Sequence, residues 1–139
     1  MDSDNLVYAS FWRRAGAALL DGLIVSVANL LVTAVVNLVI TQETLAGTVT
    51  QIISLIIGVG YYVYFIGNRG QTPGKIALKI KVQKLEDGSH LGYRGAFMRE
   101  VIGKFISGVA FGLGYLWMIR DQNHQTWHDK IAKSVVVKI

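Results

Sequence analysis

The sequence predicts an all-α membrane protein with two long transmembrane helices, a glycine-rich third membrane segment and short cytoplasmic β segments. Of its 139 residues, 52% are hydrophobic and only 17% are charged, a composition typical of a small polytopic membrane protein. Two runs, 22–42 and 44–68, contain no charged residue. Each run is long enough to cross a hydrocarbon core about 30 Å thick. Residues 1–139 are therefore expected to form a single membrane domain.

The first transmembrane helix is predicted over about residues 12–40, and it contains one carboxylate, Asp21. An ionisable side chain inside a membrane helix costs roughly 2.5 kcal/mol or more on insertion scales. Such a residue either titrates or binds a cation, or it belongs to a structural ion pair. The sequence leaves both interpretations open.

The second transmembrane helix is predicted over about residues 44–67, after a short turn. On a helix of about 3.6 residues per turn, each predicted span carries a stripe of small and polar residues. The stripes include Asn29 and Thr33 in the first span and Gln51 and Ser54 in the second. Such stripes usually form hydrogen bonds between helices, and the alternative is a hydrated pathway.

Basic residues predict the orientation of these spans. Arg13 and Arg14 precede the first span, and the loop over residues 68–95 carries six basic residues: Arg69, Lys75, Lys79, Lys81, Lys84 and Arg94. Cytoplasmic loops are enriched in Lys and Arg. We therefore expect a multi-pass protein of the cell membrane, with its N-terminus and the 68–95 loop in the cytoplasm.

A third membrane segment is predicted over about residues 96–119. Its uncharged part, 105–119, is too short to cross a bilayer alone. The segment is either a single span that begins upstream or a re-entrant hairpin, broken where glycines are frequent, near Gly108, Gly112 and Gly114. The C-terminal tail, 120–139, is basic, so its charge favours the cytoplasmic side.

Two segments of the chain resemble each other. QTPGKIALKIKVQK begins at Gln71 and QTWHDKIAKSVVVK begins at Gln125. In the first, Thr72 is expected to cap a helix that has Pro73 at its first position; in the second, Thr126 and Asp129 are expected to form a capping box. The β-branched runs 76–82 and 134–137 then predict strands, which can pair if both lie on one face. An inverted repeat with opposite faces is the alternative.

The remaining charged side chains suggest partners for Asp21. Arg14 is separated from Asp21 by about 10.5 Å along the helix axis, so we do not expect a direct bond. Arg99 enters from the same side at comparable depth, and an Asp21–Arg99 pair is therefore predicted. Glu100 and Lys104 are predicted to form a local i,i+4 pair.

Together these residues resemble the RDD family of membrane proteins, named for one arginine and two aspartates. FWRRAGAALLDGLI resembles the family's first helix, and HQTWHDKIAKSVVV resembles its C-terminal signature. By this resemblance, the signature residues are Arg14, Asp21 and Asp129, and the loop motif after the second helix is Gly70, Gln71, Thr72, Pro73, Gly74 and Lys75. The resemblance covers nearly the entire chain. It implies a multi-pass membrane protein with a suspected role in transport and no defined substrate.

The first functional hypothesis is transport of a monovalent cation, a proton or a small solute, with Asp21 as the titratable group and Arg14 and Arg99 tuning it. Two or three spans cannot enclose a path, so a homo-oligomer within the lipid bilayer is expected. The alternative is a non-transporting assembly or stress-adaptation protein that binds lipid or a partner through its basic cytoplasmic face.

Other classes of function are not expected. The sequence contains no nucleophile elbow, phosphate-binding glycine loop or zinc-protease helix, so neither an enzyme nor a cofactor is predicted. His124 and His128 have i,i+4 spacing but no third ligand fixed by the sequence, so no metal site is predicted. The net charge of +5 is explained by residues beside apolar spans, and a nucleic-acid partner is not predicted.

Overall fold

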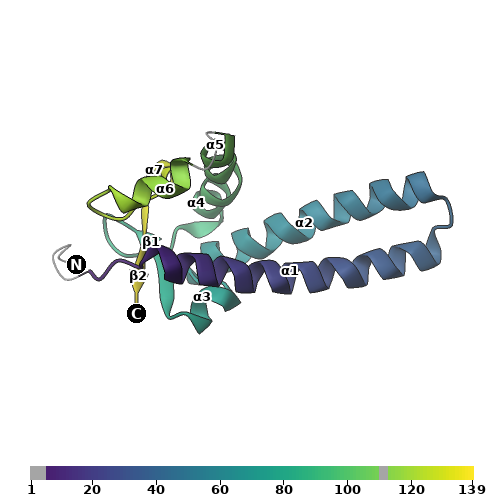
Figure 1. Ribbon diagram of the computed structural model, residues 1–139, viewed down its shortest axis with the longest axis horizontal. Helices are drawn as coiled ribbons and strands as arrows, with labels where there is room; N and C mark the ends of the chain where they lie inside the picture. Colours follow the sequence, from purple (N-terminus) through teal and green to yellow (C-terminus); the bar gives the residue numbers. More distant parts are fainter. Residues whose placement is uncertain (1–5, 110–112) are drawn as a thin grey trace.

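Two long antiparallel helices and a compact end region make up the computed structural model, which describes residues 6–109 and 113–139. Helices α1 (Phe11–Val39) and α2 (Glu43–Arg69) form a hairpin, and all later elements gather at the end opposite its turn (Figure 1). Both helices are long and apolar enough to cross a membrane, and only 6% of the apolar window of each is buried. The two predicted spans are confirmed as long apolar helices, with ends within two residues of those expected.

Local chemistry explains where these helices begin and end. The hydroxyl of Ser10 accepts a hydrogen bond from the backbone N–H of Arg13 at 3.3 Å and so caps the start of α1. Helix α2 ends at Gly70, whose φ of 70° is left-handed. A Cβ atom at Gly70 would lie 2.3 Å from the carbonyl oxygen of Val82, so only glycine fits there.

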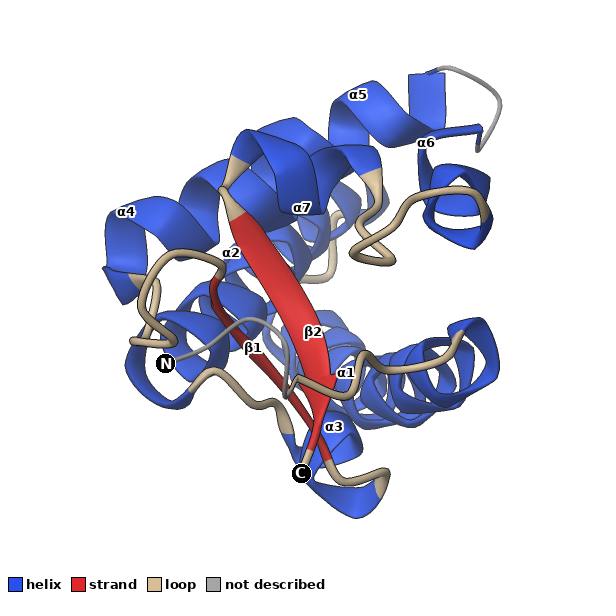
Figure 2. Cartoon of the chain, turned by 90° about the vertical axis from the view of Figure 1, so that its left-hand side faces the viewer, coloured by secondary structure: helices blue, strands red, loops and turns tan. Residues whose placement is uncertain are grey.

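The end region contains short helices and one two-stranded sheet (Figure 2). Its elements, in chain order, are α3 (Pro73–Ala77), β1 (Ile80–Lys84), α4 (Gly92–Phe97), the π-helix η2 (Met98–Gly103), α5 (Lys104–Val109), α6 (Leu113–Leu116), the 3₁₀-helix η3 (Trp117–Ile119), α7 (Trp127–Ile131) and β2 (Ser134–Lys138). Strands β1 and β2 pair antiparallel with Val82 opposite Val136. The backbone of Tyr8 extends this sheet by one bridge to Val137.

The two similar segments adopt the same local structure. In both, a threonine caps a five-residue helix, a lysine with positive φ (Lys79 at 55°, Lys133 at 51°) ends it, and a strand follows. The predicted caps at Thr72 and Thr126 and the capping box with Asp129 are confirmed. Strand pairing is confirmed too, and it places both segments at one end of the hairpin. The predicted start of the first strand is wrong, because residues 76 and 77 belong to α3 and the strand begins at Ile80.

The third segment is divided between two helical stretches. Residues 92–109 are helical through α4, η2 and α5, and α6 and η3 continue from Leu113 to Ile119. None of these elements alone passes as a membrane span in the described residues. The predicted break near Gly112 lies at 110–112, outside the described residues. Location of this segment in the membrane stays a prediction.

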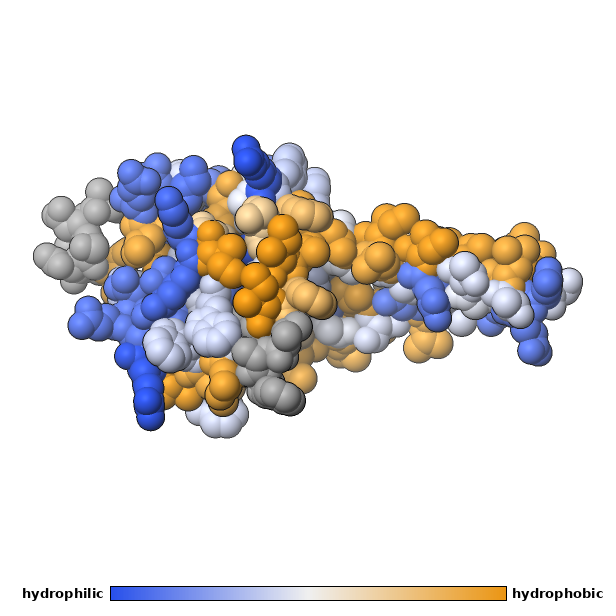
Figure 3. Space-filling view, turned by 90° about the horizontal axis from the view of Figure 1, so that it is seen from above, coloured by the Kyte–Doolittle hydropathy of each residue, from blue (hydrophilic) through white to orange (hydrophobic). Residues whose placement is uncertain are grey.

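A small apolar core holds the end region to the hairpin. It joins Ala17 of α1 and Ile66 of α2 to the inner face of the sheet, where Ile80, Val82 and Val136 are buried. Most other large apolar side chains of α1 and α2 remain exposed. Figure 3 shows hydrophobic residues along the hairpin and over part of the end region, with hydrophilic residues at the outer side of the end region and near the tip, as expected for helices whose apolar faces contact lipid.

The polar stripes of the two spans do not bond to each other. Thr33 donates its hydroxyl to the carbonyl of Asn29, and Thr48 donates to Thr44, so both hydrogen bonds stay within one helix. Among the described residues, no side chain of one stripe is hydrogen-bonded to the other stripe. The expected interhelical bonds are therefore absent within one chain.

Candidate functional site

Asp21 is buried at the junction of α1, α2 and the loop after α2. Its side chain has no exposed surface and accepts hydrogen bonds from the hydroxyls of Tyr61 and Thr72 and from the backbone N–H of Gly74. The Tyr61 and Gly74 bonds measure 2.8 and 2.9 Å. A Cβ atom at Gly74 would lie 2.7 Å from the Asp21 carboxylate, so glycine permits this close approach. The loop motif thus binds the membrane-helix carboxylate directly.

Lys75 lies beside Asp21 without bonding to it. Its ammonium is 4.0 Å from the carboxylate, which is beyond hydrogen-bond distance, and its side chain is only 10% exposed. Among the described residues, its ammonium has no hydrogen-bond partner. Burial lowers the pKa of Lys75 to about 8.

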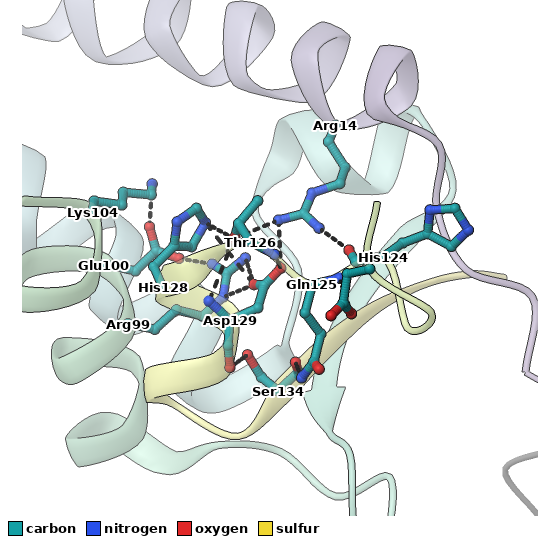
Figure 4. Close-up of polar contacts among 11 residues, drawn as sticks. Arg14, Arg99, Glu100, Lys104, His124, Gln125, Thr126, His128, Asp129 and Ser134 are labelled. Carbon is teal, nitrogen blue, oxygen red and sulfur yellow. Dashed lines mark hydrogen bonds and ion pairs between the residues drawn. The ribbon is translucent and has the colours of Figure 1, made fainter. Parts of the chain in front are cut away.

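Asp129 is the centre of a second buried group (Figure 4). Arg14 donates to one of its oxygens at 2.7 Å, and Arg99 donates from Nε to the other at 2.9 Å. Asp129 also accepts from the backbone N–H of Thr126 at 3.1 Å, which completes the capping box. Burial alone would raise the pKa of Asp129, but the guanidiniums of Arg99 and Arg14 hold it below its usual range.

The π-helix η2 supplies the third part of the cluster. Adjacent side chains Arg99 and Glu100 are both buried and pair with each other, and Glu100 also pairs with Lys104. Gly103 allows close packing, since a Cβ atom there would lie 2.6 Å from the Cβ of His128. Single turns of π-helix often occur at functional sites.

His128 is buried within this cluster. Its Nε2 lies 2.9 Å from the hydroxyl of Thr126, and its ring packs 5.0 Å from the ring of Tyr115, centroid to centroid. Burial lowers the pKa of His128 to about 3, so the imidazole is neutral at pH 7. In the described residues, no group of three or more His, Asp or Glu side chains is placed to hold a metal ion.

The structure corrects one pairing and confirms another. The predicted Asp21–Arg99 pair is wrong, because Arg99 binds Asp129 while the loop motif occupies Asp21. Absence of a direct Arg14–Asp21 bond and the Glu100–Lys104 pair are both confirmed. The position of His124 and His128 beside the capping box favours interfacial polar residues, and for His128 this prediction is wrong because it is 2% exposed.

Two hydrogen bonds of the site, from Tyr61 to Asp21 and from Arg14 to Asp129, were not predicted from the sequence. Tyr61 lies among several aromatic residues of α2, so nothing in the sequence distinguished it as the partner of Asp21. Helical side chains lean towards the N-terminus, which predicts that Arg14 points towards lipid headgroups, but it reaches across to Asp129 and to the carbonyl of His124. Its identity as a signature residue was the available signal.

Known proteins resemble this chain over most of its length. YteJ, an uncharacterized membrane protein of Bacillus subtilis, is 29% identical over 94% of this chain and 80% of its own length. YxaI, an uncharacterized protein of the same organism, is 31% identical over 93% of this chain and 96% of its own. A proline-rich antigen homolog of Mycobacterium tuberculosis is 30% identical over 72% of this chain, a match that spans 43% of that relative. No solved structure matches the chain.

The family comparison agrees with the residues that form the cluster. The model of the RDD family matches residues 8–133, a range that includes both long helices, the loop motif and α7. Arg14, Asp21 and Asp129 all lie within it. The chain is therefore a membrane protein with two candidate spans and belongs to the RDD family.

Proposed function

We propose that this protein is a non-transporting membrane protein whose buried charges fix the end region and whose basic face binds an anionic lipid or an acidic partner. The observation that carries this proposal is the environment of Asp21. Three donors occupy its two oxygens. A cation could bind there only by displacing these donors and by approaching the ammonium of Lys75.

The charged residues join the end region to α1. Arg14 and Asp21, both on α1, bind α7 and the loop motif respectively. Removing one partner from a buried ion pair typically costs about 3–5 kcal/mol, because the other charge is left uncompensated. This cost is a sufficient physical reason for the signature residues without any movement of ions.

Orientation is part of the proposal. The start of α1, the loop over 68–95 and β2 share one end of the hairpin (Figure 1). Their many basic residues favour the cytoplasm. Cysteine introduced at exposed His90 should be protected from an impermeant thiol reagent in intact cells, whereas cysteine at Thr41 in the opposite turn should be labelled. The reverse pattern would contradict this orientation.

Transport by a homo-oligomer is the second candidate, and one observation favours it. Polar side chains of both spans, including Ser26, Asn37 and Gln51, are exposed on a single chain, and the side-chain oxygen of Asn29 is buried without a partner among the described residues. Polar groups facing acyl chains are unfavourable. A second copy of this chain would cover them and could enclose a path.

A flux assay separates the two candidates. Wild-type protein and Asp21→Asn are reconstituted in liposomes, and internal pH, sodium and potassium are followed after a gradient is imposed. We expect no flux above that of empty liposomes for either protein, and we expect reduced stability in detergent for the variant. Wild-type flux that Asp21→Asn abolishes, with the variant still monodisperse, would establish transport and overturn the first proposal.

A further inference from the structure

A cleft of about 360 Å³ opens between α1, α6 and the charge cluster. Four basic side chains line it: Arg14, Lys75, Arg99 and Lys104. These residues come from four different elements, so the fold, rather than one basic run, brings them together. No Asp or Glu side chain lines the cleft in the described part of the chain.

The charges around the cleft do not balance. The four basic side chains face three buried carboxylates, those of Asp21, Glu100 and Asp129. His128 also lines the cleft, and it is neutral at pH 7. Among the described residues, the cluster therefore carries one positive charge more than it carries negative charges. A buried charge without a partner is unfavourable, so a single negative charge in the cleft would stabilise the site.

Lys75 shows where that negative charge belongs. Its ammonium is largely buried, lines the cleft and has no hydrogen-bond partner in the described residues. Its nearest carboxylate, Asp21, is 4.0 Å away and already accepts three hydrogen bonds. The other three basic side chains pair directly with Asp129 or Glu100. Three N–H groups are therefore available to an acceptor. Phosphate oxygens are strong acceptors for both ammonium and guanidinium groups.

The other wall of the cleft is apolar. Phe11, Ala15 and Ala18 line it from α1, and Met118 lines it from η3. Leu19 follows the cleft residue Ala18 and Leu116 follows the cleft residue Tyr115, and their side chains are 76% and 49% exposed. A ligand that fits both walls has an anionic head and an apolar body. A soluble anion would satisfy only the basic wall.

We propose that this cleft binds the phosphodiester group of an anionic phospholipid, with Lys75 as its principal donor and the acyl chains along α1. A phosphodiester carries one negative charge, which equals the excess of one positive charge around the cleft. The inference rests on the proposed function and names its ligand. It also assigns Lys75 of the loop motif a role in binding, in addition to its position beside Asp21.

The test measures lipid binding by the purified full chain. A short-chain phosphatidylglycerol is titrated into protein in a neutral detergent, with phosphatidylcholine of the same chain length and inorganic phosphate as the two other arms. We expect saturable binding of phosphatidylglycerol at one site per chain and roughly tenfold weaker binding by Lys75→Met, since a hydrogen bond to a charged group is lost. Lys84→Gln removes one positive charge from an exposed position on β1 outside the cleft and should weaken binding much less than Lys75→Met does.

Each other outcome decides against the inference. Equal binding of both lipids, or inorganic phosphate displacing phosphatidylglycerol at matched concentration, would assign the cleft to a different ligand. Unchanged binding by a folded Lys75→Met would overturn the role of Lys75. Should that variant fail to fold, Lys104→Gln, whose side chain is 30% exposed, replaces it with the same expected direction. If neither lipid binding nor flux is observed, only this inference is overturned. If flux depends on Asp21, the proposed function is overturned.

Discussion

The segment from Gln71 to Lys84 and the segment from Gln125 to Lys138 share one backbone conformation but contact α1 through different groups. Their helices and strands correspond residue by residue, and Val82 pairs with its counterpart Val136, which implies a local two-fold axis through the sheet. Where the first segment has Lys75, the second has Asp129. The comparison shows that one structural unit can be fixed to the same helix either by neutral donors to an aspartate of α1 or by a carboxylate that binds an arginine of α1.

Helix α1 provides the complementary charges. Asp21 binds the first segment and Arg14 binds the second. The two residues are seven positions apart, which is about two helical turns and nearly the same face. Arg13 also donates to the carbonyl of Leu78 in the first segment, and Arg14 donates to the carbonyl of His124, the residue before the second segment. The signature arginine and aspartates therefore hold two equivalent units against one helix.

Replacing Asp129 should cause the largest loss in the free energy of unfolding. Asp129→Ala leaves two buried guanidiniums without their carboxylate and removes the capping box, so we expect a loss of about 3–5 kcal/mol in the free energy of unfolding. Thermal unfolding in detergent, compared with wild type, measures it. A loss under about 1 kcal/mol would mean that the second segment does not depend on its charge.

Replacing Asp21 should cost less. Asp21→Asn keeps one carbonyl acceptor, so we expect a loss of roughly 1–3 kcal/mol from weakened bonds to Tyr61 and Gly74. Tyr61→Phe is the matched control, because it removes only the hydroxyl that donates to Asp21 and should lose less. An Asp21→Asn variant that is less stable than Asp129→Ala would contradict the proposed order.

Acid should weaken the second segment selectively. The pKa of His128 is about 3 in the folded protein and about 6.5 in an unfolded chain, so the unfolded state binds more protons between these values. Stability is therefore fully present above about pH 6.5 and falls with pH by up to roughly 1.4 kcal/mol per unit. The depressed pKa of Asp129 acts in the same direction at lower pH. His128→Asn should flatten the slope between pH 6 and pH 5, and an unchanged slope there would refute this assignment.

The two glutamines should show the smallest and most symmetrical effects. Gln71 donates to the carbonyl of Ile80 at 3.0 Å, and Gln125 donates to that of Ser134 at 2.8 Å. Each substitution by alanine should cost about 1 kcal/mol, with Gln125 the larger because it is buried. Hydrogen exchange at β1 and β2 measures both. Protection lost in one variant only would show that the segments are not equivalent.

Much of the fold follows from local sequence signals. Apolar length predicts α1 and α2, and threonine caps predict α3 and α7, because these features depend on residues within a few positions of each other. The Glu100–Lys104 pair is of the same kind. The similarity between the two segments also made their pairing as strands a natural expectation.

The partners of Asp21 could not be obtained in this way. Helical spacing fixes the face of α1 on which Asp21 lies, but not which of several segments packs against that face. Arg99 was a reasonable partner by depth, yet docking of α7 brings Asp129 between Arg99 and Arg14. The contact between Asp21 and Gly74 is possible because Gly74 has no side chain. A pattern of charged residues in the sequence does not predict such a contact.

A pair of double-mutant cycles tests most directly whether Asp21 binds the first segment while Asp129 binds Arg99 and Arg14. Unfolding free energies are measured for single and double substitutions of Arg99 with Asp129, and of Arg99 with Asp21. We expect a coupling energy of about 1–3 kcal/mol for Arg99 with Asp129 and a value within about 0.5 kcal/mol of zero for Arg99 with Asp21. Strong coupling of Arg99 to Asp21, with none to Asp129, would contradict it.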